Sequence, residues 1–209
     1  MPQTALNPVH AHERAERLAQ RLSALHEVLQ AIATSMDMDR LLRLIMDKAC
    51  SLLGVERCAL YLVEERTAEG ILLRCRHARG LPQEEFERVR LGPDEGITAH
   101  VLADVKTLWT DDILADARYP LSQGMRALLA AHDIRGILCA PVVVRRQVLG
   151  LIYLYPEAGL GFAPEEADLL SALALQAGIA LESARLLAAE GAEAPQSVAL
   201  RLDAVYPSD

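Results

Sequence analysis

The most apolar stretch of the chain, residues 134–156, predicts a pair of strands folded back on each other. Residues 137–144 are almost continuously hydrophobic, and residues 148–155 repeat that pattern after a basic connection at Arg145, Arg146 and Gln147. Apolar runs of this length, rich in β-branched and aromatic residues, are typical of strands covered on both faces. We therefore expect a central hairpin that is covered by the helical segments before and after it.

Hydrophobic residues at alternating spacings of three and four predict an amphipathic helix over residues 11–36. Its seam fits one strand of a dimeric coiled coil, and it equally fits a helix that packs on its own domain. A second helix is predicted at residues 38–53, with Asp37 as its cap and Gly54 at its end. The residues of the first seam are Leu18, Leu22, Leu25, Leu29, Ile32 and Met36.

A third helix is predicted to begin near Phe162 and to persist to about Ala189. Pro164 in the first turn and acidic residues beside it are both favoured at a helix start. Two neighbouring apolar stripes follow this helix, so one is expected to cover the sheet and the other to meet a partner helix. The first stripe is Leu170, Leu173, Ala177, Ala180, Ala184 and Leu187, and the second is Leu169, Ala172, Ile179 and Leu186.

Shorter patterns fill the middle of the chain. They predict strands at 57–63, 71–77, 88–91 and 108–110, and helices at 97–102 and 124–131. The chain thus divides into a disordered start (1–10), a coiled-coil helix (11–36), one domain (37–190), and a tail or the start of a further domain (191–209).

The composition narrows the class of protein. A chain of 209 residues that is 52% hydrophobic can bury one substantial core. The net charge of −8, without a basic cluster, argues against a nucleic-acid partner. No signal peptide or membrane span stands out, so a cytoplasmic protein without a membrane partner is expected. The four cysteines lack metal-ligand spacing and are expected to be reduced core residues rather than part of a metal site.

Several local patterns, in a fixed order, resemble the GAF domain, a small-molecule sensory fold related to PAS. Residues 94–101 (DEGITAHV) resemble the family's G-I-x-G-x-V helix start, and residues 112–119 (DILADARY) its D-V-x-x-D-P-R-Y loop. Residues 137–142 and 148–152 resemble its S-x-L-x-V-P-L…G-V-L strand pair, and residues 162–186 its closing helix. The resemblance covers about residues 37–187 and is to the bacterial signalling type of GAF domain.

This resemblance implies an α+β sandwich built on a central antiparallel sheet of five or six strands. Terminal helices would lie on one face, and short helices would enclose a ligand pocket on the other. Residues 97–102, 112–119 and 124–131 would roof that pocket. The pocket residues implied are Ala59, Tyr61, Cys75, Ile97, Trp109, Asp112, Asp116, Tyr119 and Cys139.

The chemistry of these residues leaves two interpretations open. Asp112 and Asp116 can accept hydrogen bonds from a ligand, while Trp109 and Tyr119 can stack on a planar ring. The same aspartates can instead cap loop amides, with the aromatic residues packed beneath the loop.

The cofactor remains unknown, because the sequence departs from three patterns of the family. Cyclic-nucleotide members carry N-K…F-x-x-x-D-E, whereas here Phe162 is followed by Glu166-Ala167, and no Asn-Lys pair exists. Covalent bilin needs a Cys near Gly124-Met125, where none occurs. Haem would need a histidine ligand such as His100 or His132, and a lone His at a helix end is more often solvated.

The favoured hypothesis is a non-catalytic sensory module that binds a small molecule, forms a homodimer and acts on a C-terminal output domain. The dimer interface is expected at Leu18, Leu22, Leu25, Leu29, Ile32, Leu173, Ala177, Ala180, Ala184 and Leu187. One alternative is a free methionine sulfoxide reductase of the same fold, with Cys75 and Cys139 meeting across adjacent strands, although the family's catalytic-Cys loop has no counterpart here. Another is a dimerisation scaffold with a filled pocket.

Overall fold

A six-stranded antiparallel sheet forms the centre of the molecule, in the computed structural model, which describes residues 38–68, 70–157 and 159–193. The strands lie in the order β3-β2-β1-β6-β5-β4. They are β1 (Arg57–Thr67), β2 (Gly70–Arg79), β3 (Arg90–Leu91), β4 (Leu108–Thr110), β5 (Ile137–Val144) and β6 (Gln147–Tyr155). The predicted seam at residues 18–36, the cap at Asp37 and the segment 194–209 lie outside the described residues.

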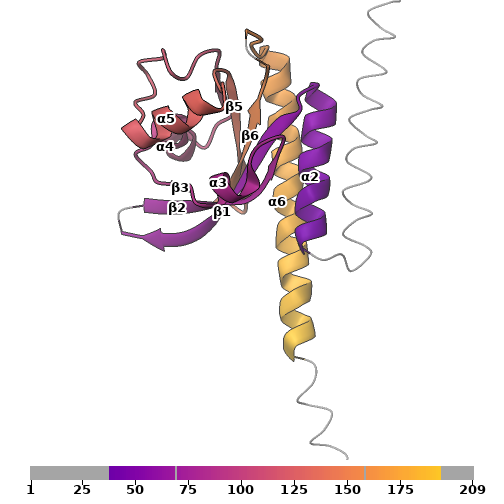
Figure 1. Ribbon diagram of the computed structural model, residues 1–209. Coiled ribbons are helices and arrows are strands. Elements are labelled where there is room, and N and C mark those ends of the chain that lie inside the picture. Colours follow the sequence, from indigo (N-terminus) through magenta and orange to yellow (C-terminus); the bar gives the residue numbers. More distant parts are fainter. Residues whose placement is uncertain (1–37, 69, 158, 194–209) are drawn as a thin grey trace, which may run out of the picture.

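The helices cover the two faces of this sheet unequally (Figure 1). The long helices α2 (Met38–Leu53) and α6 (Pro164–Glu193) lie side by side on one face. The short helices α3 (Gln83–Glu87), α4 (Gly96–Asp104) and α5 (Gln123–Ala131) lie on the other face with the connecting loops. The α+β sandwich with a sheet of five or six strands is therefore confirmed.

Alternation along the strands divides the core in two. On β6, Ile152 and Leu154 face the long helices, whereas Leu151, Tyr153 and Tyr155 face the short ones. Both sets are buried, which is why the sequences of β5 and β6 are almost continuously apolar.

A proline is tolerated within β5 because the neighbouring strand is short. β4 pairs with β5 only from Ile137 to Cys139, so β5 has a free edge at Pro141. A residue without a backbone N–H costs no ladder hydrogen bond at such an edge.

The central hairpin closes with a tighter turn than expected. Only Arg145 and Arg146 connect the strands, both with positive φ (47° and 68°), and Gln147 already belongs to β6. Positive φ at both central residues is typical of two-residue hairpin turns, because the twist of such a turn matches the twist of the two strands. Gly and Asn usually occupy these two positions. Neither residue type occurs here, so the sequence predicted a connection of three residues instead.

Helix α6 packs closely on the sheet through small residues. Leu170, Ala174 and Ala177 are buried beneath it, and a Cβ added at Gly178 would lie 2.6 Å from the carbonyl oxygen of Val143. By length and composition, residues 164–186 would also fit a membrane span. One face of this helix is buried against the sheet.

Candidate functional site

A small cavity lies between the sheet and the short-helix layer. Its volume is about 30 Å³, space on the order of two water molecules. Residues of β1, β5 and β6 form its floor, and residues of α4, α5 and the adjoining loops form its roof. The described residues that line it are Tyr61, Phe86, Leu91, Glu95, Gly96, Ile97, Thr98, Ile113, Leu121, Met125, Leu128, Leu129, Ile137, Tyr153 and Tyr155.

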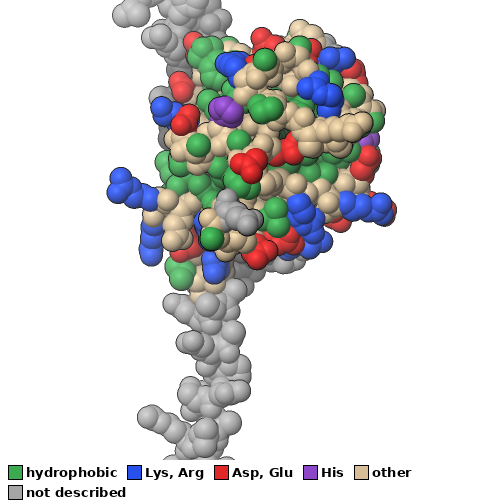
Figure 2. All heavy atoms as spheres, turned by 90° about the vertical axis from the view of Figure 1, so that its left-hand side faces the viewer, with side chains coloured by type: hydrophobic (Ala, Val, Ile, Leu, Met, Phe, Trp, Pro, Cys, Tyr) green, Lys and Arg blue, Asp and Glu red, His purple; other side chains and the backbone are tan. Residues whose placement is uncertain are grey.

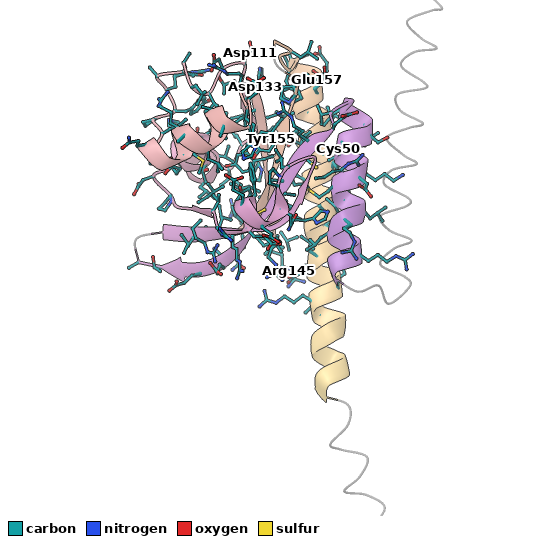
Figure 3. The ribbon with its side chains drawn as sticks, viewed as in Figure 1. Cys50, Asp111, Asp133, Arg145, Tyr155 and Glu157 are labelled. Carbon is teal, nitrogen blue, oxygen red and sulfur yellow. The ribbon has the colours of Figure 1, made fainter. Side chains whose placement is uncertain are left out.

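Three tyrosines dominate the floor of this cavity. The rings of Tyr61 and Tyr153 meet edge to face, with their centroids 5.4 Å apart. The rings of Tyr153 and Tyr155 are stacked at 6.1 Å. Such contacts hold the rings in fixed orientations, and Tyr155 lies in the interior between the sheet and the short helices (Figure 3).

The three phenolic hydroxyls differ in their partners. The hydroxyl of Tyr153 lies 2.7 Å from that of Thr98 on α4. Within the described residues, those of Tyr61 and Tyr155 have no hydrogen-bond partner. Neither oxygen is fully enclosed, because the described buried side-chain atom without a partner is the hydroxyl oxygen of Thr107. Burial raises the pKa of all three tyrosines, so each keeps its proton and can donate a hydrogen bond.

The charge around the cavity is sparse. Glu95 is the ionisable carboxylate among its described lining residues, and that lining includes no Lys, Arg or His. Oε1 of Glu95 accepts a hydrogen bond of 2.9 Å from the backbone N–H of Ser122, which ties the start of α4 to the loop before α5. On the surface of this layer, charges of both signs are interspersed, with acidic side chains near its centre (Figure 2).

The sequence-predicted pocket residues on the strands fall into two groups. Tyr61 lines the cavity, as does Ile97 from the start of α4. Ala59, Cys75 and Cys139 belong to the same core cluster, on the cavity face of the sheet, without lining the cavity itself.

Trp109 lies on the opposite face of the sheet, which corrects the expectation that it lines the pocket. It pairs with Leu138, and both side chains pack with the core beneath α2 and α6. A strand of three residues offers too little alternation to fix its phase.

The carboxylates of Asp112 and Asp116 accept hydrogen bonds from their own loop and from the adjoining strand β4. Oδ1 of Asp112 accepts hydrogen bonds from the backbone N–H groups of Leu114 and Ala115. Asp116 accepts from the Thr110 hydroxyl at 2.8 Å and from Nε of Arg118 at 2.9 Å. The Arg118 guanidinium holds the pKa of Asp116 well below its usual range. Neither carboxylate lines the cavity.

The remaining aromatic and histidine candidates also lie outside the cavity lining. Tyr119 is buried against the ring of His100, with the centroids 5.1 Å apart. His132 at the end of α5 has its Nε2 2.9 Å from Oε2 of Glu85 on α3. Both histidines are thus engaged in contacts between neighbouring surface elements.

Sequence reasoning missed most of the polar residues of the cavity. Tyr153 and Tyr155 share the phase of Leu151 on β6, so alternation along this strand was the signal that could have found them. Thr98 follows Ile97 in the predicted helix start, but nothing in the sequence marks it as buried. Helix α3 was missed altogether, because five residues give no periodic pattern, and its Phe86 reaches the cavity.

The described part of the predicted dimer interface is used within the subunit. Leu173, Ala177 and Ala180 are buried between α6 and the sheet, and Ala184 packs against that core. The side chain of Leu187 and the seam at Leu18, Leu22, Leu25, Leu29 and Ile32 lie outside the described residues. The face that α6 leaves exposed carries Ala172, Ile179 and Leu186 of the other stripe, together with Leu175. Leu169, the remaining member of that stripe, packs against the core.

Cys75 and Cys139 do not meet. They lie on β2 and β5, which are separated by β1 and β6, so about 14 Å divides their strands. Burial raises the pKa of the Cys75 thiol to about 12 and also raises that of Cys139. All four cysteines are free and buried, and the described residues contain no cluster suited to a metal ion.

Solved structures of other proteins share this architecture. A GAF domain of a phosphoenolpyruvate-protein phosphotransferase from Coxiella burnetii is 19% identical, with a TM-score of 0.66 over 82% of this chain and 98% of that one. The free methionine-R-sulfoxide reductase of Neisseria meningitidis is 17% identical, with a TM-score of 0.62 over 80% and 91% of the two chains. These likenesses show the fold.

Sequence comparison finds a related protein and a matching family model. A probable 3',5'-cyclic phosphodiesterase of Caenorhabditis elegans is 24% identical over 157 residues, which are 71% of this chain and 21% of that protein. The chain thus spans about a fifth of the length of this relative. The family model described as GAF domain matches residues 37–181, well over half of the chain. With its six-stranded sheet between long and short helices, the chain therefore belongs to the GAF domain family, whose members are sensory domains of signalling proteins.

Proposed function

We propose that this domain is a regulatory sensor that binds a compact molecule in the tyrosine-lined cavity. The observation that carries the proposal is the pair of hydroxyls on the buried Tyr61 and Tyr155, which have no hydrogen-bond partner among the described residues. A ligand or water in the cavity would supply the hydrogen bonds that these two hydroxyls lack within the described residues.

The cavity favours an uncharged ligand with a planar, hydrogen-bonding shape. An anion would meet the carboxylate of Glu95, and the described lining holds no cation to balance the two charges. This disfavours a cyclic nucleotide, whose phosphate needs a positive partner. A ligand larger than two waters requires α5 to move, and Met125 and Leu128 on that largely exposed helix are the adaptable part of the roof.

The long helices α2 and α6, on the other face of the sheet, would transmit the effect of ligand binding. In our proposal the domain forms a homodimer through the exposed stripe of α6 together with the seam at residues 18–36, and it regulates an output domain. Ligand binding would shift the population of cavity geometries and so change how the sheet supports α6. The chain would act in the cytoplasm, without a nucleic-acid or membrane partner and without catalysis of its own.

A reductase is the weaker candidate. Its motivation was a Cys75–Cys139 partnership, and these residues lie on strands that do not adjoin. Their raised pKa values keep both thiols protonated, whereas the reaction needs a thiolate. The other alternative is a dimerisation scaffold whose cavity holds only water. The experiment described next distinguishes such a scaffold from a sensor.

Native mass spectrometry of the protein purified from its own host tests the proposal, since it reports the subunit number and any retained small molecule together. The expected result is a dimer with extra mass, which the double substitution Tyr61→Phe and Tyr155→Phe releases and Tyr119→Phe retains. Phenol, imidazole and cyclic AMP would then be compared as probes by thermal shift. No retained mass and no shift with any probe would favour the scaffold.

A further inference from the structure

A pair of cysteines lies on the helix side of the sheet, away from the cavity. Cys50 on α2 and Cys58 on β1 share a hydrogen bond, with their sulfur atoms 2.9 Å apart (Figure 3 labels Cys50). Both thiols are reduced and buried. A disulfide bond joins sulfurs at about 2.05 Å, so less than 1 Å of approach separates this pair from that bond.

An ion pair at the surface lies over these thiols. Arg79 stands opposite Cys58 in the sheet register, and its Nη1 lies 2.8 Å from Oδ1 of Asp47. Asp47 precedes Cys50 by three residues, about one turn of α2. The side chains of Arg79 and Asp47 are 44% and 61% exposed, so this ion pair lies at the surface near the two thiols.

The two thiols are not equivalent. The hydrogen bond with Cys58, helped by the charge of Arg79, lowers the pKa of Cys50. The same pairing and burial raise the pKa of Cys58. Cys50 is therefore the thiol that ionises first, and Cys58 lies within reach as its partner. Burial raises the pKa of the other two cysteines of the chain, and neither has a thiol neighbour in the described structure.

We propose that Cys50 and Cys58 form a reversible thiol–disulfide pair that responds to hydroperoxides. The Cys50 thiolate attacks the peroxide O–O bond, taking one oxygen as a sulfenic acid, while the other leaves as an alcohol, or as water when the oxidant is H₂O₂. The Cys58 sulfur then attacks the Cys50 sulfur, so that the S–S bond forms, the S–O bond breaks and water leaves. Two thiols lose two electrons in total, which the hydroperoxide accepts. A dithiol reductant reverses the change.

Oxidation would join α2 covalently to β1. The two residues are connected by the turn at Gly54, so the bond closes a short loop without crossing the molecule. Since α2 packs beside α6, the modification would restrict the helical layer rather than the cavity.

Treatment of the full chain with H₂O₂, followed by a thiol count under denaturing conditions, tests the proposal. The count is expected to fall from four to two and to return to four with dithiothreitol. Trypsin separates the two cysteines, because it cleaves after Lys48 and Arg57. The oxidised protein should therefore yield peptides 49–57 and 58–66 joined by a bond that a reductant cleaves.

Cysteine substitutions identify which two thiols form the disulfide bond. Cys50→Ser and Cys58→Ser should each abolish the cross-link, whereas the double variant Cys75→Ser and Cys139→Ser should retain it. Four unreacted thiols in the wild type, a cross-link that includes Cys75 or Cys139, or stable sulfinic acid at Cys50 would each overturn the proposal. The wild-type peptide map gives this answer even where a variant fails to fold.

Discussion

The hydroxyl of Tyr153 on β6 lies 2.7 Å from the hydroxyl of Thr98 on α4, and both side chains are buried. This contact joins the floor of the cavity to its roof. It also sets the position of α4, whose first residue, Gly96, accepts no larger side chain without meeting Leu121.

Thr98→Val should destabilise the domain by about 1–2 kcal/mol, because it leaves the buried Tyr153 hydroxyl with only the weak thiol of Cys139 as a partner. The double variant with Tyr153→Phe removes both polar groups and should cost less than the sum of the single changes. Urea denaturation of the four proteins measures the coupling. Additive losses would mean that the two hydroxyls do not depend on each other.

Gly178→Ala should destabilise the domain by roughly 1–3 kcal/mol, because the new methyl group would collide with the backbone of β5. Gly124→Ala on α5 is the matched control, since no atom lies within 4 Å of the added carbon. The control should gain about 0.5–1 kcal/mol from helix propensity. Thermal and urea denaturation compare the two, and equal effects would contradict the close approach of α6 to the sheet.

Asp116→Asn should lower the stability of the domain at pH 7. The stability difference between the variant and the wild type should shrink in acid. The pKa of Asp116 in the folded protein is depressed by Arg118, so its contribution is fully present above the unfolded pKa of about 3.9. It disappears as the pH falls from there through the lower folded value. Urea denaturation at pH 7, 4 and 3 should show the wild type and the variant converging. Asp94→Asn, which removes a carboxylate at an exposed turn, is the control.

Replacing Arg145-Arg146 by Asn-Gly should stabilise the central hairpin by about 1 kcal/mol, because both positions have positive φ. The Lys-Lys variant keeps the charge and the backbone cost, and should match the wild type. Chemical denaturation measures the difference. An equal gain in the Lys-Lys protein would show that positive φ at these two positions is not the cause.

Leu175→Glu combined with Ile179→Glu should convert the proposed dimer to a monomer with little loss of stability, because both side chains are exposed in the subunit. Ala127→Glu combined with Ala130→Glu is the matched control, since it adds the same charge at exposed positions of α5, in the opposite layer. The control should remain a dimer. Sedimentation at several concentrations measures the association state, and a dimer that survives the α6 substitutions would exclude this stripe as its interface.

Much of this fold could be predicted, because long strands and helices repeat their patterns often enough to fix their phase. The resemblance to the GAF domain placed Tyr61 on the cavity face, and Met38–Leu53 was predicted with the bounds that the structure has. The shortest elements could not be predicted. Helix α3 and strand β4 span less than two periods of their patterns, so neither Phe86 nor Trp109 could be assigned a direction.

The two stripes of α6 show a different limit. Both are apolar, and periodicity alone gives no reason to choose between them. The choice is made by Gly178 beside Ala174 and Ala177, whose small side chains permit the helix to approach β5. The larger Leu175 and Ile179 are left outside.

The position of Trp109 has an optical consequence. It is the single tryptophan of the chain, and it lies on the helix side of the sheet, whereas Tyr61, Tyr153 and Tyr155 lie on the cavity side. Tryptophan emission therefore reports on the packing of the long helices, and tyrosine absorbance reports largely on the cavity. A spectroscopist can follow the two layers of this small domain separately, at different wavelengths and without attaching a dye.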